Sequence, residues 1–387
     1  MTWQNAILGD CVDILSGYAF KSDRFNDEGR GLPLVRIRDV VSGQSDTFYD
    51  GPYEDRYLVS DGDVLIGMDG EFNRAQWRGG RSLLNQRVCK ISSSNGRLSE
   101  RYLFHILPQI LKRIEDQTPF VTVKHLSAKD LRQTELLLPP IEEQHRIAAI
   151  LDSASIVRSK LIQLRGLAEE LLKSAFLTLF GDPGTNPKNW PIGTIRDLLN
   201  DAKYGTAQKA NASSGKYPML RMGNLTYAGR IETTDLKFVD LADSDLEKYS
   251  LRRGDLLFNR TNSPELVGKT AVFDLEGVYV YAGYLIRARV RDDMADPYYL
   301  SHFLNSDYGK KTLREMCKSI IGMANINAQE LQNIRVPIPP VNTQRQFRRI
   351  VEQVEAMRGK ADRQLFDAEN LFSSLSQRAF NGQLRGA

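Results

Sequence analysis

Residues 138–151 read LPPIEEQHRIAAIL and residues 338–351 read IPPVNTQRQFRRIV, so a Pro-Pro pair precedes a charged run with spaced apolar residues twice, two hundred residues apart. Proline is tolerated in the first turn of a helix, where its missing N–H would have no partner, and it keeps the preceding residue extended. Each Pro-Pro pair therefore predicts the start of a helix.

The apolar residues after each Pro-Pro pair alternate steps of three and four, which is the a/d pattern of a coiled coil. The predicted seam consists of Ile147, Ile150, Ala154, Val157, Leu161, Leu164, Ala168, Leu171 and Ala175 in the first helix, and of Phe347, Ile350, Val354, Met357, Ala361, Gln364, Ala368, Leu371 and Leu375 in the second. A helix of about 40 residues is roughly 60 Å long, more than a small domain needs to cover its core. We expect the two helices to pair with each other, antiparallel.

The regions before the two helices also repeat each other in the same order. GLPLVRIRDVVSG (31–43) is similar to KYPMLRMGNLTYAG (216–229), SDGDVLIGMDG (60–70) to RRGDLLFNRTN (252–262), and RYLFHIL (101–107) to YYLSHFL (298–304). Short apolar runs between Gly, Asp and Asn predict strands, and the longer runs with three- and four-residue spacing predict a helix inside each region. The chain is therefore a duplicated unit.

This organisation predicts an α+β protein with two similar mixed α/β domains and two long helices that form an antiparallel coiled coil with pseudo-twofold symmetry. The expected segments are a first mixed domain over 1–140, a first helical spacer over 141–180, a second mixed domain over 181–340 and a second helical spacer over 341–387. We expect the helices to act as a rigid bar with a domain at each end.

The composition favours a globular protein of the cytoplasm. Hydrophobic residues make up 41% and charged residues 26% of the chain, and no apolar run approaches the ~20 residues of a membrane span. The N-terminus does not show the pattern of an export signal. Cys11, Cys89 and Cys317 are far apart in the sequence, which indicates buried thiols in a reducing compartment and argues against a zinc site.

Charge is unevenly distributed within the first domain. Residues 1–69 carry 6 basic and 13 acidic side chains, whereas residues 70–132 carry 12 basic and 5 acidic side chains. The second segment could attract phosphate groups. The alternative is that two oppositely charged faces attract each other within one domain.

No recognisable catalytic constellation accompanies this architecture. The stretch VGKT (267–270) ends like a phosphate-binding loop, but Ser263 stands where that motif needs its first glycine. The four histidines show no i, i+4 pair of metal ligands, and no glycine-rich strand-turn-helix for a nucleoside cofactor is present. We expect a non-catalytic chain without a cofactor or a bound metal.

Two similar modules on a rigid bar suit two half-sites on one DNA duplex. Their basic and amide side chains could contact phosphates and read guanine and adenine edges. The predicted DNA-binding residues are Arg74, Trp77, Arg78, Arg81, Asn85, Gln86, Arg87, Lys124 and His125 in the first domain, and Lys203, Tyr204, Lys209, Arg221, Asn224, Asn259, Arg260, Thr261, Asn262 and Lys269 in the second. The alternative for loops such as NRTN (259–262) is an ordinary solvated turn.

Along nearly its whole length the chain resembles the specificity subunit of type I restriction-modification systems. The resemblance rests on the stretches LLLPPIEEQHRIAAILD (136–152), LFGDPGTNPKNWP (179–191), GKYPMLRMGNLTYAGRI (215–231), RRGDLLFNRTN (252–262), TVKHLSAKDL (122–131) and VPIPPVNTQRQ (336–346). The Pro-Pro-x-x-x-Gln helix starts and the FGDPxTNP linker are its most specific motifs, whereas GDLLF alone is weak.

The resemblance implies two target-recognition domains, each reading half of an asymmetric bipartite DNA sequence. It also implies that two modification subunits, which carry the methyl donor site and methylate adenine, dock on the helices, and that motor-driven restriction subunits join them. One departure is that Asn342 and Thr343 stand where the first helix has Glu142 and Glu143, which puts the symmetry of docking in doubt. The alternative function is a non-catalytic helical scaffold that bridges two protein partners.

Overall fold

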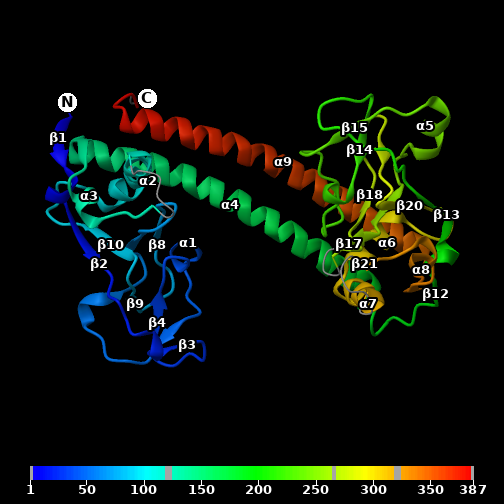
Figure 1. Ribbon diagram of the computed structural model, residues 1–387, viewed down its shortest axis with the longest axis horizontal. Helices are drawn as coiled ribbons and strands as arrows, with labels where there is room; N and C mark the ends of the chain where they lie inside the picture. Colours follow the sequence, from blue (N-terminus) through cyan, green and yellow to red (C-terminus); the bar gives the residue numbers. More distant parts are fainter. Residues whose placement is uncertain (1–2, 118–123, 264–266, 318–323, 385–387) are drawn as a thin grey trace. The chain divides into compact units, whose positions relative to one another are not determined.

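Two helices of 40 residues, α4 (Ile141–Phe180) and α9 (Val341–Phe380), begin directly after the two Pro-Pro pairs. A computed structural model describes residues 3–117, 124–263, 267–317 and 324–384 (Figure 1). The chain divides into two compact units, which we call unit 1 (Met1–Lys160 with Leu365–Ala387) and unit 2 (Leu161–Gln364). Each unit contains one mixed α/β domain and one part of each long helix. The expected α+β class with two long helices is confirmed.

Unit 1 is built on small sheets, and the four-stranded one packs against a helix of the domain. A four-stranded sheet has the order β2 (Val12–Ser16), β10 (Val88–Ser93), β7 (Val64–Gly67) and β8 (Arg74–Gln76); a second has the order β3 (Phe25–Asn26), β5 (Phe48–Tyr49), β4 (Leu32–Val35), β9 (Ser82–Leu84) and β6 (Leu58–Val59). β1 (Gln4–Ile7) pairs with β11 (Glu135–Leu138), and the helices are α1 (Asp39–Ser42), α2 (Glu100–Gln117) and α3 (Ala128–Arg132).

Unit 2 repeats this topology. Its four-stranded sheet has the order β13 (Leu199–Tyr204), β20 (Leu285–Val290), β16 (Leu256–Asn259) and β18 (Thr270–Val272); a three-stranded sheet has the order β15 (Lys237–Val239), β14 (Tyr217–Leu220) and β19 (Val280–Tyr281). The paired strands β12 (Ile192–Thr194) with β22 (Arg335–Pro337) and β17 (Thr261–Asn262) with β21 (Ala324–Asn325) complete it, together with α5 (Asp243–Tyr249), α6 (Pro297–Asn305), α7 (Asp307–Cys317) and α8 (Ala328–Gln332).

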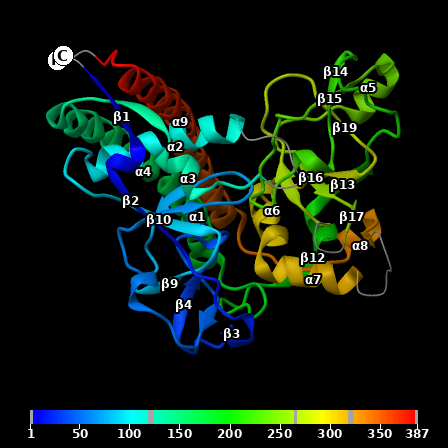
Figure 2. The same cartoon turned by 60° about the vertical axis from the view of Figure 1, so that its left-hand side comes forward.

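The central strands are apolar because both of their faces are covered. β7 (VLIG) and β16 (LLFN) are buried at all four positions. The apolar side chains of α2 and of α6 belong to the same core clusters as these sheets, and Figure 2 shows the helices from a second side. Burial of a branched apolar side chain stabilises the fold by about 1.5–3 kcal/mol. The periodicity of two in the strands and of three to four in the helices therefore accounts for both cores.

The two long helices lie side by side and antiparallel in each unit. In unit 1, Arg158 Nε lies 3.3 Å from Glu369 Oε1, and in unit 2, Arg165 Nε lies 2.9 Å from Asp362 Oδ1. As the residue number rises along α4 it falls along α9, which is the expected direction.

The residues of each long helix that are covered differ from the predicted a/d seam at every second seam position. The shared row, at Ile147 and every seventh residue after it, is covered, but the second row is the i+4 row, with Leu151 and Leu172 buried, instead of the i+3 row. Of the predicted seam, Ile147, Ala168, Phe347, Val354 and Ala361 are buried; Ile150, Ala154, Leu161, Ala175, Ile350, Ala368 and Leu375 are partly buried; Val157, Leu164, Leu171, Met357, Gln364 and Leu371 are exposed. Because both rows flank the shared row on a helix, apolar spacing alone does not decide between them.

A buried glutamine explains the motif Pro-Pro-x-x-x-Gln. In unit 1, Gln144 accepts a hydrogen bond from the backbone N–H of Ser99 at 2.8 Å and donates to the carbonyl oxygens of Arg97 and Pro139, both at 2.9 Å. The side chain is 0% exposed, so all of its hydrogen bonds go to the protein. It fastens the first turn of α4 to the loop that leads into α2.

The same arrangement recurs in unit 2. Gln344, also 0% exposed, accepts from the N–H of Asp296 at 2.9 Å and donates to the carbonyl oxygens of Met294 at 3.1 Å and Pro339 at 2.8 Å. This loop leads into α6. We call the two contacts the glutamine latches.

Within the described ranges, no helix is long and apolar enough to cross a membrane, and no group of three or more His, Cys, Asp or Glu side chains is placed to hold a metal ion. Cys11, Cys89 and Cys317 are buried and unpaired. Burial raises the pKa of the Cys89 thiol to about 12, so this thiol stays protonated and inert.

Candidate nucleic-acid interface

Three side chains meet beyond the end of β7 in unit 1. His125 Nδ1 lies 2.6 Å from Asp69 Oδ1, and Arg87 Nη1 lies 3.5 Å from the same oxygen. The same Nδ1 lies 3.1 Å from Arg87 Nη1, so the three side chains contact one another pairwise, and the His125 Nε2 lies on the other edge of the ring. Arg87 and His125 are 53% and 48% exposed. Asp69 thus orients two side chains that face solvent.

Two further predicted cations of unit 1 are held by neighbours. Lys124 Nζ donates to the carbonyl oxygen of Glu115 at 2.9 Å and lies 3.6 Å from its carboxylate. The Arg74 guanidinium lies 3.5 Å from the centre of the Phe104 ring, and burial lowers the pKa of Arg74 to about 10. Arg74 remains positively charged at neutral pH, and both side chains are held in place by these contacts.

The remaining predicted residues of unit 1 divide between surface and core. Arg78, Arg81 and Gln86 are exposed, and they make no ion pair within the part of the chain that is described. Trp77 is buried, and its indole N–H donates to the carbonyl oxygen of Gly80 at 2.8 Å. Asn85 is also buried and accepts a hydrogen bond from the N–H of Gln86. These two side chains pack inside the domain and do not face solvent.

The corresponding end of β16 in unit 2 carries an aromatic and cationic cluster. The Arg260 guanidinium lies 4.8 Å from the centre of the Tyr204 ring, and the Tyr204 hydroxyl accepts a hydrogen bond from the N–H of Ala328 at 2.9 Å. Next to them, the Thr261 hydroxyl lies 3.4 Å from Asn325 Oδ1. This group has the stacking, fork and amide chemistry that nucleic-acid interfaces use.

The other predicted residues of unit 2 lie in several environments. Lys203 and Lys209 are exposed, Lys269 lies over the Tyr227 ring, and Arg221 pairs with Asp235 at 2.9 Å. Asn224 and Asn259 are buried, and the amide of Asn224 donates to the carbonyl oxygens of Glu232 and Asp235. The side chain of Asn262 lies outside the described part of the structure. The predicted residues of unit 2 are therefore divided between exposed, paired and buried positions.

Sequence reasoning missed Asp69, Tyr284 and Asn325. An acidic side chain was not sought in a surface for polyanions, although Asp69 acts by holding its two neighbours. Asn325 could have been found by aligning ANINAQEL (324–331) with KHLSAKDL (124–131), which places it opposite His125.

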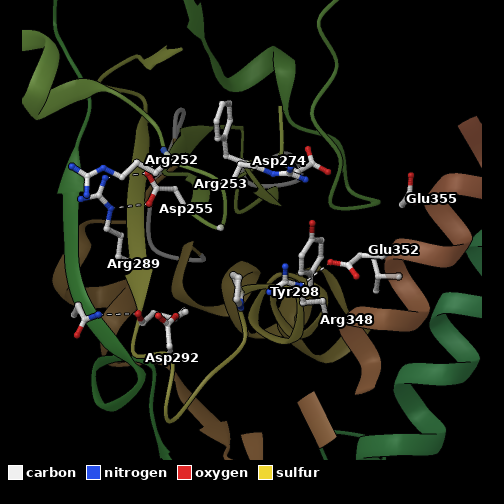
Figure 3. A pocket seen from close by; sticks show the side chains of 16 residues that line it. Arg252, Arg253, Asp255, Asp274, Arg289, Asp292, Tyr298, Arg348, Glu352 and Glu355 are labelled. Carbon is white, nitrogen blue, oxygen red and sulfur yellow. Dashed lines mark hydrogen bonds and ion pairs between the residues drawn. The ribbon is translucent and has the colours of Figure 1, made fainter. Parts of the chain in front are cut away.

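Unit 2 also contains a cavity of about 610 Å³ that borders the four-stranded sheet, α6 and α9. Figure 3 shows Asp255 against Arg289, 2.8 Å apart, and Arg348 against Glu352, also 2.8 Å apart. The lining mixes arginines with acidic side chains that include Asp274 and Glu355 (Figure 3). Because these charges largely compensate one another, the cavity does not attract a polyanion.

Comparisons with known proteins agree with this geometry. The chain is 27% identical over 414 residues to the EcoBI type I restriction enzyme specificity subunit of Escherichia coli, over 99% of this chain and 86% of that protein. It is 24% identical over 416 residues to the EcoKI specificity subunit of Escherichia coli strain K12, over 99% and 89%. The S subunit of a type I restriction-modification system from M. genitalium shares the fold, with a TM-score of 0.63 at 15% identity over 98% of this chain and 96% of that one.

A family model described as "Type I restriction modification DNA specificity domain" matches residues 1–169 and 187–363, which lie in both halves of the duplication. The chain therefore belongs to the type I restriction-modification DNA specificity family, whose two domains serve DNA target recognition.

Proposed function

We propose that this chain is the non-catalytic recognition subunit of a type I restriction-modification complex, in which each mixed domain reads one half of a bipartite DNA sequence. The observation that carries the proposal is the pair of equivalent surfaces beyond β7 and β16. One presents Arg87 and His125 and the other presents Tyr204, Arg260 and Asn325. Two equivalent surfaces with different side chains are what an asymmetric target requires.

Exposed cations of the two domains supply phosphate contacts. Arg78, Arg81 and Lys209 are exposed, so each can release a counterion when it meets a phosphate. Such contacts position the protein on the duplex and carry no sequence information directly. Methylation and cleavage belong to other subunits. The chain acts in the cytoplasm, where it can reach DNA and where a reducing environment keeps its buried cysteines unpaired.

The long helices carry the docking surface for two modification subunits, which restriction subunits then join. α4 is apolar on more of its circumference than α9 can cover: Leu164, Leu167 and Leu171 are 39%, 54% and 47% exposed. On α9, Met357 and Leu371 are 50% and 56% exposed. Exposed apolar rows of this kind mark protein interaction sites. Counted from Ile147 in α4 and from Phe347 in α9, each helix presents the row that begins three residues later to a partner. The row that begins four residues later faces the other helix.

A domain exchange tests modular readout. Residues 185–340 are replaced by the corresponding region of a relative, and the sequence methylated by the complex with its modification subunits is determined. We expect one half of the recognised sequence to change and the other half to stay the same. A change in both halves would refute independent readout by the two domains.

A salt titration separates DNA recognition from the alternative scaffold function. Binding to DNA through several phosphates weakens steeply, by about 10³-fold or more between 50 and 200 mM salt for six or more contacts. A largely apolar interface between proteins responds far less. Absence of sequence-specific DNA binding at low salt, with the modification subunits present, would favour the scaffold.

A further inference from the structure

We propose that three equivalent backbone positions in each unit determine the purine that is read in one base pair of each half-site. The positions are Asp69, Arg87 and His125 in unit 1, and Thr261, Tyr284 and Asn325 in unit 2. This inference rests on the proposed function and deepens it, because it names the side chains that select the base and their supporting residue.

Strand register establishes that the positions are equivalent. Gly67 of β7 pairs with Val88 of β10, and Asn259 of β16 pairs with Leu285 of β20, in the same antiparallel arrangement. Two residues beyond the first member of each pair, Asp69 forms a bridge with His125, and Thr261 pairs with Asn325. The residues just before Val88 and Leu285 are Arg87 and Tyr284.

The backbone hydrogen bonds repeat as well. The N–H of Met68 donates to the carbonyl oxygen of Arg87 at 2.9 Å, and the N–H of Arg260 donates to that of Tyr284 at 3.0 Å. The N–H of Leu126 donates to the carbonyl oxygen of Met68 at 2.7 Å, and the N–H of Ile326 donates to that of Arg260 at 2.9 Å. Three chain segments are thus joined in the same way in both units.

The three outward positions differ in chemistry between the two copies, as do Met68 and Arg260 between them. The supporting residues on either side of them, Val88 and Leu126 in unit 1 and Leu285 and Ile326 in unit 2, are apolar and buried. At the three outward positions, a carboxylate, a guanidinium and an imidazole in unit 1 stand opposite a hydroxyl, a phenol and an amide in unit 2. A common support with exchanged polar side chains is the arrangement expected of a reading site.

The set in unit 1 is organised around a guanidinium. Asp69 contacts both His125 Nδ1 and Arg87 Nη1, which leaves the other N–H groups of Arg87 and the His125 Nε2 for contacts outside the set. A guanidinium fork is the side chain that most often reads guanine O6 and N7. Arg87 has φ 73, a conformation that non-glycine residues rarely adopt, which fits a side chain held for function.

The set in unit 2 is organised around an amide. Asn325 is exposed, and its Oδ1 lies 3.4 Å from the Thr261 hydroxyl, which restricts the amide plane. A carboxamide can donate to adenine N7 and accept from its N6 amino group at the same time. Tyr284, 52% exposed, lies at the third position with a flat apolar face.

The test transplants one set into the other copy. The variant Asp69→Thr, Arg87→Tyr, His125→Asn is assembled with the modification subunits, and its preference is measured on DNA randomised in both half-sites. We expect the purine preference at one position of the half-site read by unit 1 to fall about ten- to a hundred-fold. Preferences in the other half-site should not change.

Two single variants keep the test informative if the triple variant does not fold. Asn325→Ala should relax one position of the half-site read by unit 2, whereas Arg81→Ala, an exposed cation outside both sets, should weaken binding to all sequences about equally. Unchanged preferences in a folded Asn325→Ala complex, or a relaxation in both half-sites at once, would overturn this inference and leave a bipartite recognition subunit intact. Absence of any sequence preference in the unmodified complex would instead overturn the proposed function.

Discussion

Replacement of Gln344 tests whether the glutamine latch holds α9 to the second domain. Gln344→Ala removes three hydrogen bonds and leaves the buried N–H of Asp296 without its acceptor. Gln344→Met also removes them but nearly conserves the side-chain volume. Comparison of the two variants separates hydrogen bonding from packing.

The magnitude follows from the geometry. A hydrogen bond inside a protein contributes about 1 kcal/mol net, and a buried donor left unpaired costs about 1–3 kcal/mol. Three bonds at 2.8–3.1 Å and 0% exposure therefore predict a loss of about 3 kcal/mol in the free energy of unfolding. This is a large share of the roughly 5–15 kcal/mol that holds a typical domain folded.

Urea unfolding followed by circular dichroism measures the loss, and hydrogen exchange at the N–H of Asp296 shows whether it is local. Gln346→Ala is the matched control, because Gln346 is exposed on the same turn of α9 and should change stability by less than about 0.5 kcal/mol. If the free energy of unfolding lost in Gln344→Ala were restored in Gln344→Met, side-chain volume and not hydrogen bonding would account for the stabilising effect of Gln344, and the reasoning would fail.

Two other changes probe the packing of the second mixed domain against the long helices within unit 2. Burial next to Phe347 lowers the pKa of His302 to about 4, below its ordinary value of 6.5. Below pH 6.5 the unfolded chain therefore binds a proton that the folded chain does not, and we expect the free energy of unfolding to fall by up to about 1.4 kcal/mol per pH unit between pH 6.5 and 4. The variant His302→Gln should make this fall less steep. Arg230 bridges Glu169 of α4 at 2.7 Å and Glu355 of α9 at 2.9 Å. Arg230→Met should therefore lower the free energy of unfolding, measured with urea, by about 2 kcal/mol. A loss no greater than that caused by removing an exposed lysine would contradict a stabilising bridge.

The existence of the long helices and their first residues could be predicted from the sequence, because proline marks their first turn and the apolar spacing continues for many turns. The row that joins the helices could not. At Val157 and Leu164 the apolar residue was assigned to the seam, whereas the structure places the next residues, Arg158 and Arg165, against acidic partners on α9. An isolated sequence does not tell which apolar row faces a helix of the same chain and which is left for another protein.

The surfaces that we propose for DNA reading could be predicted in part. The polar stretch NRTN (259–262) begins at the last residue of a buried strand, and the structure buries Asn259 but leaves Thr261 partly exposed. Strand alternation does not predict this difference, because residues two positions apart share one face of a strand. Trp77 was predicted to bind DNA, although its size and its one donor suit a core position equally well. Partners of an outward side chain, such as Asp69 for His125, come from segments far apart in the chain, and only the strand register brings them together.

The glutamine latches touch the mixed domains only through main-chain atoms: the Ser99 and Asp296 nitrogens and the Arg97 and Met294 oxygens. A different mixed domain that has the same short loop before its helix can therefore attach to the long helices without a matching change in those helices. Genetic exchange between related loci could therefore yield a new target sequence in a single event, while the shared joint remains as it was.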